Sequence, residues 1–255
     1  MRARRRRAWI VVALLAVAFA AFAPAFWRDN GHTLMARATA AEGDRAAAAA
    51  TRVRPALERD LAAAGLHWGA PVFMRIFKEE SELELWIEGA DGRYVLFRTW
   101  PVCAWSGRLG PKLREGDNQA PEGFYRVDAA RMNPRSQYHL SFNLGYPNAY
   151  DRAHGHTGSF LMVHGACVSI GCYAMGDAAI EQIYTLAAAA HAGGQRAFDV
   201  HAFPFRPEAA RLDAAKASPW HAFWSELAPA WTAFEQSRRP PRIRVVDGRY
   251  MVGEG

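Results

Sequence analysis

The chain has little net charge once its N-terminal end is set aside. Five of its 31 lysine and arginine residues lie within the first seven positions, which leaves 26 basic residues against 25 acidic ones. No stretch interleaves basic with aromatic residues, so the sequence lacks the electrostatic footprint of a nucleic-acid-binding protein. It also lacks an internal repeat and a glycine-rich phosphate-binding loop. These absences argue against a repeat architecture and against nucleotide or nucleic-acid partners.

Residues 1–27 predict export from the cytoplasm. Arginines at positions 2 and 4–7 precede the uncharged run AWIVVALLAVAFAAFAPAFW, the pattern of a secretory signal peptide. We expect cleavage at a small-residue site such as Ala18-Phe19-Ala20 or Ala21-Phe22-Ala23. An uncleaved run at 8–27 would instead anchor the chain in the inner membrane, with the arginines on the cytoplasmic side.

Cysteine is scarce, and the number of cysteines is odd. The three residues are Cys103, Cys167 and Cys172. Thiols of exported proteins tend to pair, so at least one should stay free or reactive. One hypothesis pairs Cys103 with Cys167 and spares Cys172; the alternative leaves Cys103 and Cys167 as buried free thiols.

Three regions follow the signal: an alanine-rich linker at 28–51, a domain at 52–206, and a helical extension with a hairpin at 207–255. Alternating or continuously apolar runs separated by glycine, proline and asparagine loops predict short strands in the domain. This pattern favours a mainly β fold with added helices, an α+β architecture built on a sandwich or barrel. Arg75 and Lys78 are expected on a solvated strand face. The predicted strands are 72–78, 83–89, 93–100, 123–128, 137–143, 160–164 and 198–203.

Helical patterns are fewer. Apolar spacing predicts a short helix at 54–64 stopped by Gly65, and a second that begins at an Asp177 N-cap and ends at Gly193-Gly194. A bulky amphipathic helix between Trp220 and Phe234 is expected to pack over the sheet. The tail IRVVDGRYMV reads as a hairpin with an Asp247-Gly248 turn.

The nonapeptide HGACVSIGC, residues 164–172, carries the candidate catalytic groups. A thiol is nucleophilic as its thiolate, and a nearby histidine can accept its proton, so His164 and Cys172 form a candidate base and nucleophile. Gly171 allows a substrate carbonyl to approach backbone N–H groups that can serve as an oxyanion hole. Ser169 either orients the imidazole as a third triad member or stabilises the loop.

His164-Gly165 followed by Ser169-Ile170-Gly171-Cys172 resembles the HG...SxGC signature of the L,D-transpeptidase (YkuD-type) family. The Pro121-Glu122-Gly123 turn is similar to the family's P-x-G element. The resemblance covers residues 52–206, and further segments in the same order are similar to the YafK-like branch: RIFKEESELELW (75–86), CAWSGRLGPK (103–112), GDNQAPEGFY (116–125), SFNLGYPNAYDR (141–152) and HAFPF (201–205).

The resemblance implies a periplasmic peptidoglycan enzyme without a cofactor. Cys172 would attack a carbonyl of meso-diaminopimelate and form a thioacyl intermediate, with His164 as general base and then general acid. The YafK-like branch includes hydrolytic members that release a covalently bound outer-membrane lipoprotein, so we expect this outcome; cross-linking or lipoprotein attachment is the alternative. Two departures from typical members match that branch: a closer histidine and cysteine, and Tyr173-Ala174 where an aliphatic residue and arginine usually follow.

Other assignments are weaker. Tyr173 and Trp105 are candidate walls of the substrate site, although such aromatic residues more often pack, and Asn148 is a candidate contact. Asp151 and Arg152 are expected to be structural. A zinc site would need a poorly spaced ligand set, so we predict no metal; a non-catalytic peptidoglycan-binding protein is a further alternative. The ligands considered for zinc are His154, His156, His164, Cys167 and Cys172.

Overall fold

The computed structural model describes residues 45–253. The predicted signal or anchor at 1–27 and most of the predicted linker lie outside this range. Within it, no helix is both long enough and apolar enough to cross a bilayer.

The described chain begins with a helix over residues 45–63, which starts before the boundary predicted at position 52. Leu57 and Leu61 are buried one turn apart, and Gly65 follows the helix with a left-handed φ of 69°. Glycine adopts this conformation without a Cβ penalty, which explains why the helix ends where the sequence predicts.

A five-stranded mixed sheet forms the centre of the molecule in the order β3-β2-β1-β10-β5. β1 and β10 are parallel and the other neighbours are antiparallel. Long sequence separation between β1 and β10 is what allows a parallel pair, because such strands need a crossover connection. The strands are β1 (Val72–Phe77), β2 (Glu82–Glu88), β3 (Tyr94–Pro101), β5 (Gly123–Asp128) and β10 (Ala197–Phe203).

A second sheet of short strands carries the nonapeptide, in the order β4-β9-β8-β7-β6. Two predicted strands are shorter than expected because non-glycine residues with positive φ interrupt them: His139 (φ 68°) before β7 and Phe160 (φ 55°) before β8. The strands are β4 (Ala104–Trp105), β6 (Met132–Asn133), β7 (Ser141–Asn143), β8 (Met162–His164) and β9 (Tyr173–Ala174).

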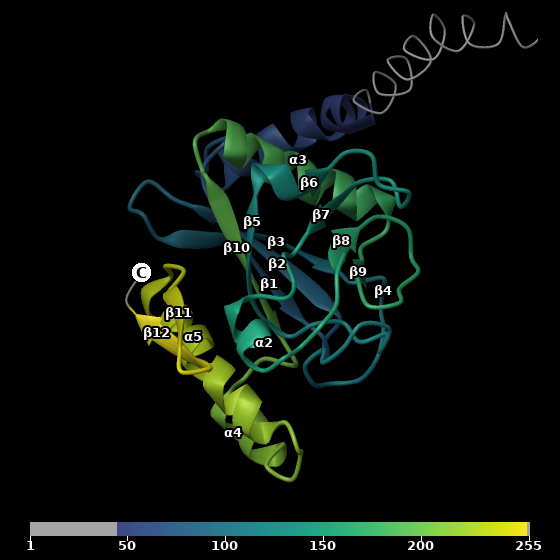
Figure 1. Ribbon diagram of the computed structural model, residues 1–255. Coiled ribbons are helices and arrows are strands. Elements are labelled where there is room, and N and C mark those ends of the chain that lie inside the picture. Colours follow the sequence, from purple (N-terminus) through teal and green to yellow (C-terminus); the bar gives the residue numbers. More distant parts are fainter. Residues whose placement is uncertain (1–44, 254–255) are drawn as a thin grey trace, which may run out of the picture. The chain divides into compact units, whose positions relative to one another are not determined.

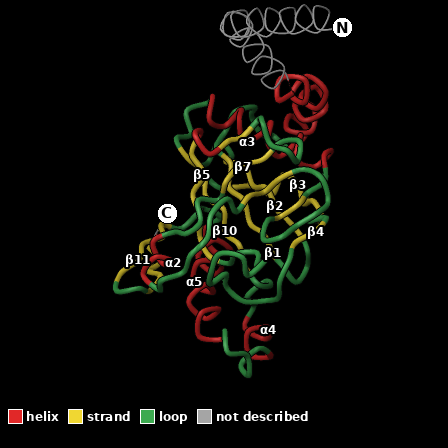
Figure 2. The backbone as a smooth tube through the Cα atoms, turned by 45° about the vertical axis from the view of Figure 1, so that its right-hand side comes forward, coloured by secondary structure: helices red, strands yellow, loops and turns green. Residues whose placement is uncertain are grey.

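Helices cover both faces of the central sheet (Figures 1 and 2). One apolar core contains residues of the 45–63 helix, of α3 (Asp177–Ala192) and of both sheets. The opposite face of the central sheet packs against α5 (His221–Ser237) and the hairpin of β11 (Arg242–Val246) and β12 (Arg249–Gly253). The remaining elements are η1 (Ala129–Arg131), α2 (Ala149–Ala153) and α4 (Ala209–Ala214). The α+β prediction is therefore confirmed.

The hairpin and the aromatic helix also agree with the sequence. Asp247 and Gly248 have φ values of 49° and 73°, as a type I′ turn requires. Phe234 of α5 packs against Phe73 of β1 with ring centroids 4.8 Å apart. The Asp177 cap is different: α3 starts at Asp177 itself, and the Asp177 carboxylate instead accepts a hydrogen bond from the backbone N–H of Ala166 at 2.8 Å.

Arg75 and Lys78 correct the prediction of a solvated strand face. Both side chains are buried. Arg75 pairs with Glu84 at 2.7 Å and Glu235 at 2.6 Å, and Lys78 pairs with Glu122 at 2.9 Å. The face is covered by the C-terminal extension, so burial of the two cations depends on carboxylates that sequence alternation does not reveal.

Candidate active site

His164 and Cys172 line the same cavity, which has a volume of about 420 Å³. β8 and β9 are parallel, with His164 beside Ala174 and Val163 beside Tyr173. One position earlier, Cys172 lies beside Met162, whose backbone N–H donates to Cys172 Sγ at 3.4 Å. Both side chains line the cavity, so the imidazole and the thiol face the same space.

The imidazole of His164 is held in one tautomer. Its Nδ1 lies 2.5 Å from the carbonyl oxygen of Gly165, which can only accept a hydrogen bond. Nδ1 therefore carries the proton and Nε2 is the basic nitrogen. Burial lowers the pKa of His164, although the Gly165 carbonyl partly offsets this effect. The ring also packs on Tyr138, with centroids 4.7 Å apart.

The surroundings of Cys172 favour the neutral thiol over the thiolate. Burial raises the pKa of Cys172, while the Met162 N–H and the charge of Lys112 act in the opposite direction. The side chain remains partly exposed to the cavity. A neutral imidazole that shares a cavity with a neutral thiol can accept the thiol proton when the substrate arrives, which is general-base activation.

Ser169 holds the loop before Cys172. Its hydroxyl donates to the carbonyl of Cys172 at 2.7 Å and accepts from the N–H of Gly171 at 3.2 Å. The hydroxyl oxygen of Ser106 lies 3.2 Å from Oγ of Ser169. The partner of the imidazole is Gly165, so these contacts match the loop-stabilising role of Ser169 and not the orienting role assigned in the triad.

Gly165 and Gly171 of the motif are each required for a different physical reason. Gly171 has a φ of 139°, a conformation that residues with a side chain rarely adopt, and a Cβ there would lie 3.2 Å from Leu161. Gly165 has ordinary dihedrals, but a Cβ would approach the carboxylate of Asp177 and the carbonyl of Tyr138 to 2.7 Å each. Gly165 thus permits close packing behind the histidine, and Gly171 permits the turn into the cysteine.

Substituting Gly171 with alanine is expected to lower the free energy of unfolding by about 1–3 kcal/mol, the cost of holding a non-glycine residue in a rare backbone conformation. Chemical denaturation measures the change. Gly253→Ala is the control, because Gly253 has no positive φ and a Cβ there would make only an ordinary van der Waals contact, with the carbonyl oxygen of Arg242 at 3.8 Å; its effect should stay within about 0.5 kcal/mol. Equal effects at both positions would contradict the assigned role of Gly171.

The disulfide hypothesis is confirmed. Cys103 and Cys167 are bonded, with Cα atoms 5.4 Å apart, and Cys172 is free. The bond joins the catalytic loop to the segment that enters β4, so it restrains the chain between His164 and Cys172. Cys167 is no longer available as a zinc ligand. No group of three or more histidine, cysteine or acidic residues suited to a metal occurs within residues 45–253.

The predicted substrate contacts lie elsewhere. Tyr173 is fully buried and its hydroxyl donates to the carbonyl of Pro121 at 2.7 Å, so it cannot form a wall of the site. The Nε1 of Trp105 donates to Ser81 at 3.2 Å, and its ring does not line the Cys172 cavity. Asn148 caps α2 and bonds the carbonyl of Phe124 at 2.9 Å. These three predictions are corrected: the residues pack or cap rather than contact this cavity.

Asp151 and Arg152 have structural contacts, as expected, but they are not paired with each other. Asp151 completes the capping box of α2 and lies 3.3 Å from Nδ1 of His156. Arg152 bonds the carbonyl of Pro147.

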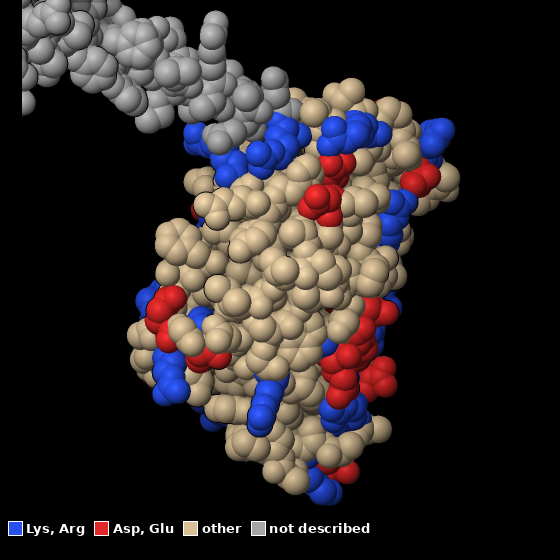
Figure 3. Space-filling model, turned by 90° about the vertical axis from the view of Figure 1, so that its right-hand side faces the viewer, with Lys and Arg blue, Asp and Glu red and all other residues tan. Residues whose placement is uncertain are grey.

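The cavity has an apolar rim that the sequence analysis missed. Phe160 and Ile170 are 72% and 79% exposed, and Val168 and Tyr138 are also exposed. Val168 and Ile170 lie in the nonapeptide, while Tyr138 and Phe160 lie in loops before β7 and β8. The last two fall within the strands predicted at 137–143 and 160–164, so the sequence did not predict their exposure. Figure 3 views the molecule from the side of β4, β8 and β9, and the middle of this face is largely uncharged. Lys112 is the cation of the cavity lining, and Asp117 already pairs with it at 2.5 Å.

Comparisons with known proteins were made at the level of structure and of sequence. Two solved structures resemble the fold: the helical cell shape determining protein Pgp2 of Campylobacter jejuni (17% identity, TM-score 0.42, covering 75% of this chain and 80% of that one) and Bd1075 of Bdellovibrio bacteriovorus (15%, TM-score 0.36, 68% and 76%).

Closer similarity is found at the level of sequence. The model of the YkuD L,D-transpeptidase catalytic domain matches residues 76–193, a range that contains both His164 and Cys172. The Escherichia coli (strain K12) protein named "Putative L,D-transpeptidase YafK" is 45% identical over 186 residues, which cover 73% of this chain and 75% of that protein. The protein of the same name from Escherichia coli O157:H7 gives the same values. The chain belongs to the L,D-transpeptidase family.

Proposed function

We propose that the protein is a periplasmic cysteine enzyme that hydrolyses the amide between meso-diaminopimelate of peptidoglycan and a bound lipoprotein. The observation that supports it most directly is the shared cavity of Cys172, the free thiol, and His164, whose Nε2 is the basic nitrogen. Export by residues 1–27 would bring this site to its substrate, either as a cleaved protein or one held at the inner membrane.

The reaction proceeds through two acyl transfers. Nε2 of His164 takes the thiol proton as Sγ of Cys172 bonds to the substrate carbonyl carbon, and charge develops on the carbonyl oxygen. When the C–N bond breaks, the imidazolium returns its proton to the leaving amine and a thioacyl enzyme remains. Water, deprotonated by the same imidazole, then forms the new C–O bond, and the C–S bond breaks to regenerate the thiol.

Gly171 and its neighbours are the proposed oxyanion loop. The N–H of Gly171 donates a hydrogen bond to Ser169 Oγ, with a nitrogen–oxygen distance of 3.2 Å that is near the upper limit for such a bond. A carbonyl oxygen that becomes charged is a stronger acceptor than a hydroxyl, so the substrate can displace Ser169 from this donor during attack.

Water as the acceptor is favoured by the charge of the cavity. Transfer to a second stem peptide would bring a carboxylate with the incoming amine, and an arginine is the usual bidentate partner of a carboxylate. The residues after the nucleophile are Tyr173 and Ala174, both buried. Lys112, the cation of the lining, is engaged by Asp117. No free cation in the described lining is therefore placed to hold such an acceptor.

Product analysis tests the proposal. Purified protein is incubated separately with tetrapeptide muropeptides and with lipoprotein-linked muropeptides, and the products and any thioacyl adduct on Cys172 are identified by mass spectrometry. Release of lipoprotein with a free meso-diaminopimelate carboxyl is the expected result. Cross-linked muropeptide dimers would instead establish transpeptidation, and a Cys172→Ala variant that still forms the products would exclude the cysteine mechanism.

A further inference from the structure

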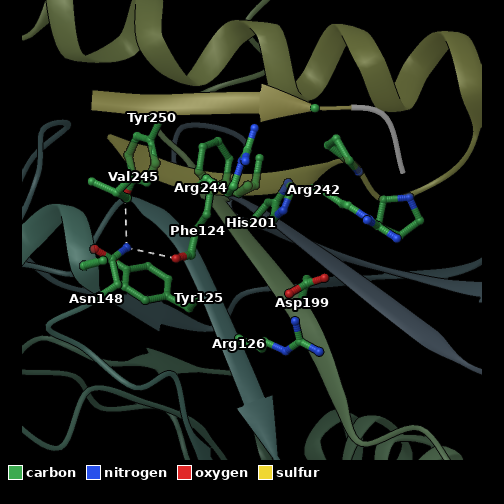
Figure 4. A pocket seen from close by; sticks show the side chains of 15 residues that line it. Phe124, Tyr125, Arg126, Asn148, Asp199, His201, Arg242, Arg244, Val245 and Tyr250 are labelled. Carbon is green, nitrogen blue, oxygen red and sulfur yellow. Dashed lines mark hydrogen bonds between the residues drawn. The ribbon is translucent and has the colours of Figure 1, made fainter. Parts of the chain in front are cut away.

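A larger cavity lies on the other face of the central sheet, away from Cys172. Its volume is about 900 Å³, within the range of small-molecule and peptide sites, and it shares no lining residue with the Cys172 cavity. The strands β5 and β10 form its floor and the start of β11 forms its roof (Figure 4). The C-terminal extension thus creates a second hollow rather than only covering the sheet.

Strand register explains the floor. Arg126 lies beside Asp199, and Phe124 lies beside His201, on the paired strands β5 and β10. These side chains alternate with Val127 and Val200, which point into the apolar core. The floor therefore presents a guanidinium, a carboxylate, an imidazole and a phenyl ring in two adjacent rows.

The roof is fixed in place by Tyr250 of β12. The Tyr250 hydroxyl accepts a hydrogen bond from Nδ2 of Asn148 at 2.9 Å, and the same amide donates to the carbonyl of Phe124 at 2.9 Å. Tyr250 also stacks on Tyr150 with centroids 4.4 Å apart. Asn148, predicted as an active-site contact, instead joins the hairpin to the floor of this cavity, as the dashed lines in Figure 4 show.

Polar groups in the cavity are left without partners in the described structure. His201 is 1% exposed, and its Nδ1 has no hydrogen-bond partner. Asp199 forms no ion pair within 4.0 Å, although burial raises the pKa of its carboxyl and the charge of Arg126 opposes this. Arg242 and Arg244 of the roof are exposed, and no carboxylate of residues 45–253 pairs with them. Nδ1 of His201 is thus a buried polar atom without a partner, which is uncommon and needs a reason. The exposed arginines are charged groups that a ligand could reach.

The neutral state of the His201 imidazole determines which charges a ligand of this cavity must match. Burial, with a contribution from Arg75, lowers the pKa of His201 to about 3, so the ring is neutral and contributes a hydrogen-bonding nitrogen rather than a charge. Three guanidinium groups and one carboxylate remain. A complementary ligand carries more than one carboxylate together with an ammonium group.

A neighbouring hollow extends the site along the sheet. It has a volume of about 500 Å³, shares Asp199 and Pro240 with the first cavity, and is lined further on by Glu88, Tyr94 and Arg239. Asp199 therefore lines both hollows, which together form a groove with side chains of both charge signs along it. An extended peptide that carries carboxylates and an ammonium group can contact both kinds of side chain, whereas a single compact anion cannot.

We propose that this groove binds a second peptidoglycan stem peptide, with its carboxylates at Arg126, Arg242 and Arg244 and the free ammonium of its meso-diaminopimelate at Asp199. This inference rests on the proposed function for the identity of the polymer. Occupation of the groove would hold the enzyme on the cell wall while Cys172 acts on a neighbouring stem, which raises the local substrate concentration.

Binding is measured on the full chain with Cys172→Ala, so that turnover does not interfere. Binding of a soluble tripeptide muropeptide is measured by calorimetry, and binding of intact cell-wall sacculi by co-sedimentation. Each measurement compares Cys172→Ala with the same protein that also carries Arg242→Glu/Arg244→Glu. We expect sacculus binding to fall at least tenfold. Two charge reversals at exposed strand positions should leave the fold intact, which circular dichroism checks; Arg59→Glu on the exposed side of the 45–63 helix is the single-charge control and should change binding less than twofold.

Ammonium recognition is tested separately. Acetylating the diaminopimelate amine should weaken binding of the muropeptide about tenfold, and Asp199→Asn should remove most of that difference. An acidic peptide of unrelated sequence with one lysine distinguishes general charge attraction from stem-peptide recognition. Unchanged binding in the arginine variant, or equal binding of the unrelated peptide, would overturn the inference.

Measurements of catalytic rate distinguish a failure of the groove proposal from a failure of the proposed function. With Cys172 present, Arg242→Glu/Arg244→Glu should keep its kcat on small soluble muropeptides and lose rate only on intact sacculi. Equal rates on sacculi would reject the groove even when the cysteine chemistry holds. Retained turnover in Cys172→Ala would reject the proposed mechanism. The binding measurements would still test whether the groove binds stem peptides.

Discussion

Replacing Cys172 with alanine is expected to lower kcat/KM on lipoprotein-linked muropeptide by a factor on the order of 10⁴ or more, because loss of a covalent nucleophile removes the entire thioacyl route. The fold should change little, since the side chain is partly exposed and its contacts are weak: the Met162 N–H at 3.4 Å and the Phe160 carbonyl at 3.6 Å. Mass spectrometry of the products measures the rate, and thermal unfolding confirms the fold.

Two variants show that the effect comes from nucleophilicity. Cys172→Ser keeps the shape and a hydroxyl of higher pKa, so it should be nearly as inactive as alanine. His164→Gln should lower kcat by a factor of roughly 10²–10⁴, the usual contribution of a general base. Comparable activity in Cys172→Ala and in the wild type would refute the mechanism.

The disulfide supplies an internal control on the same protein. The double variant Cys103→Ser/Cys167→Ser removes the sulfur atoms of the other two cysteines, which are bonded to each other. Because Cys172 is the free thiol, the thioacyl adduct should still form in this double variant. An adduct that disappears with Cys103 or Cys167 and survives without Cys172 would reassign the nucleophile.

Local patterns in the sequence predict the helices and strands more accurately than they predict which side chains contact each other. The 3.6-residue spacing from Phe223 to Phe234 identifies α5 because those residues do bury one helix face. His164 and Cys172 were identifiable because a thiol needs a base and the loop between them is short. Strands at 137–143 and 160–164 were overextended, since apolar character does not reveal the positive φ of His139 or Phe160.

Tertiary partners explain most of the errors. Alternation placed Arg75 on a solvated face, but Glu235, 160 residues away, meets it from α5. Tyr173 is adjacent to the nucleophile in sequence, yet strand alternation turns it to the opposite face and into the core. The arginines and Asp199 of the second groove come from three strands, β5, β10 and β11, that are separated by more than 35 residues in sequence, so no short sequence window contains the site.

Lys78 anchors the segment that leads to the active site. Its side chain is 0% exposed, and its ammonium bonds Glu122 at 2.9 Å, Arg108 O at 2.8 Å and Ala120 O at 3.0 Å. Glu122 also accepts from Nε1 of Trp224 in α5 at 2.8 Å. Burial lowers the pKa of Lys78, and Glu122 opposes this shift, so the pair persists through mutual charge and hydrogen bonds.

Lys78→Met is expected to lower the free energy of unfolding by about 3–5 kcal/mol, because it leaves the Glu122 carboxylate buried without its cation. For a domain of this size, each kcal/mol corresponds to a shift of about 2–4 °C in Tm, so the loss should be plain in calorimetry. The matched control is Lys216→Met, whose side chain is 69% exposed in its pair with Asp213; we expect less than about 0.5 kcal/mol there.

A double variant separates loss of the pair from exposure of a lone charge. Adding Glu122→Gln to Lys78→Met removes the uncompensated carboxylate and keeps one acceptor oxygen, which can serve either Trp224 Nε1 or the Gly110 N–H; these donate to separate oxygens of Glu122 at 2.8 Å and 2.7 Å. The double variant should therefore be more stable than the sum of the two single changes predicts. Because Pro121, beside Glu122, accepts the hydroxyl of Tyr173 next to Cys172, recovery of stability should be accompanied by recovery of kcat. Strictly additive losses would mean that the cation acts through packing alone and that the charge pair does not position the site.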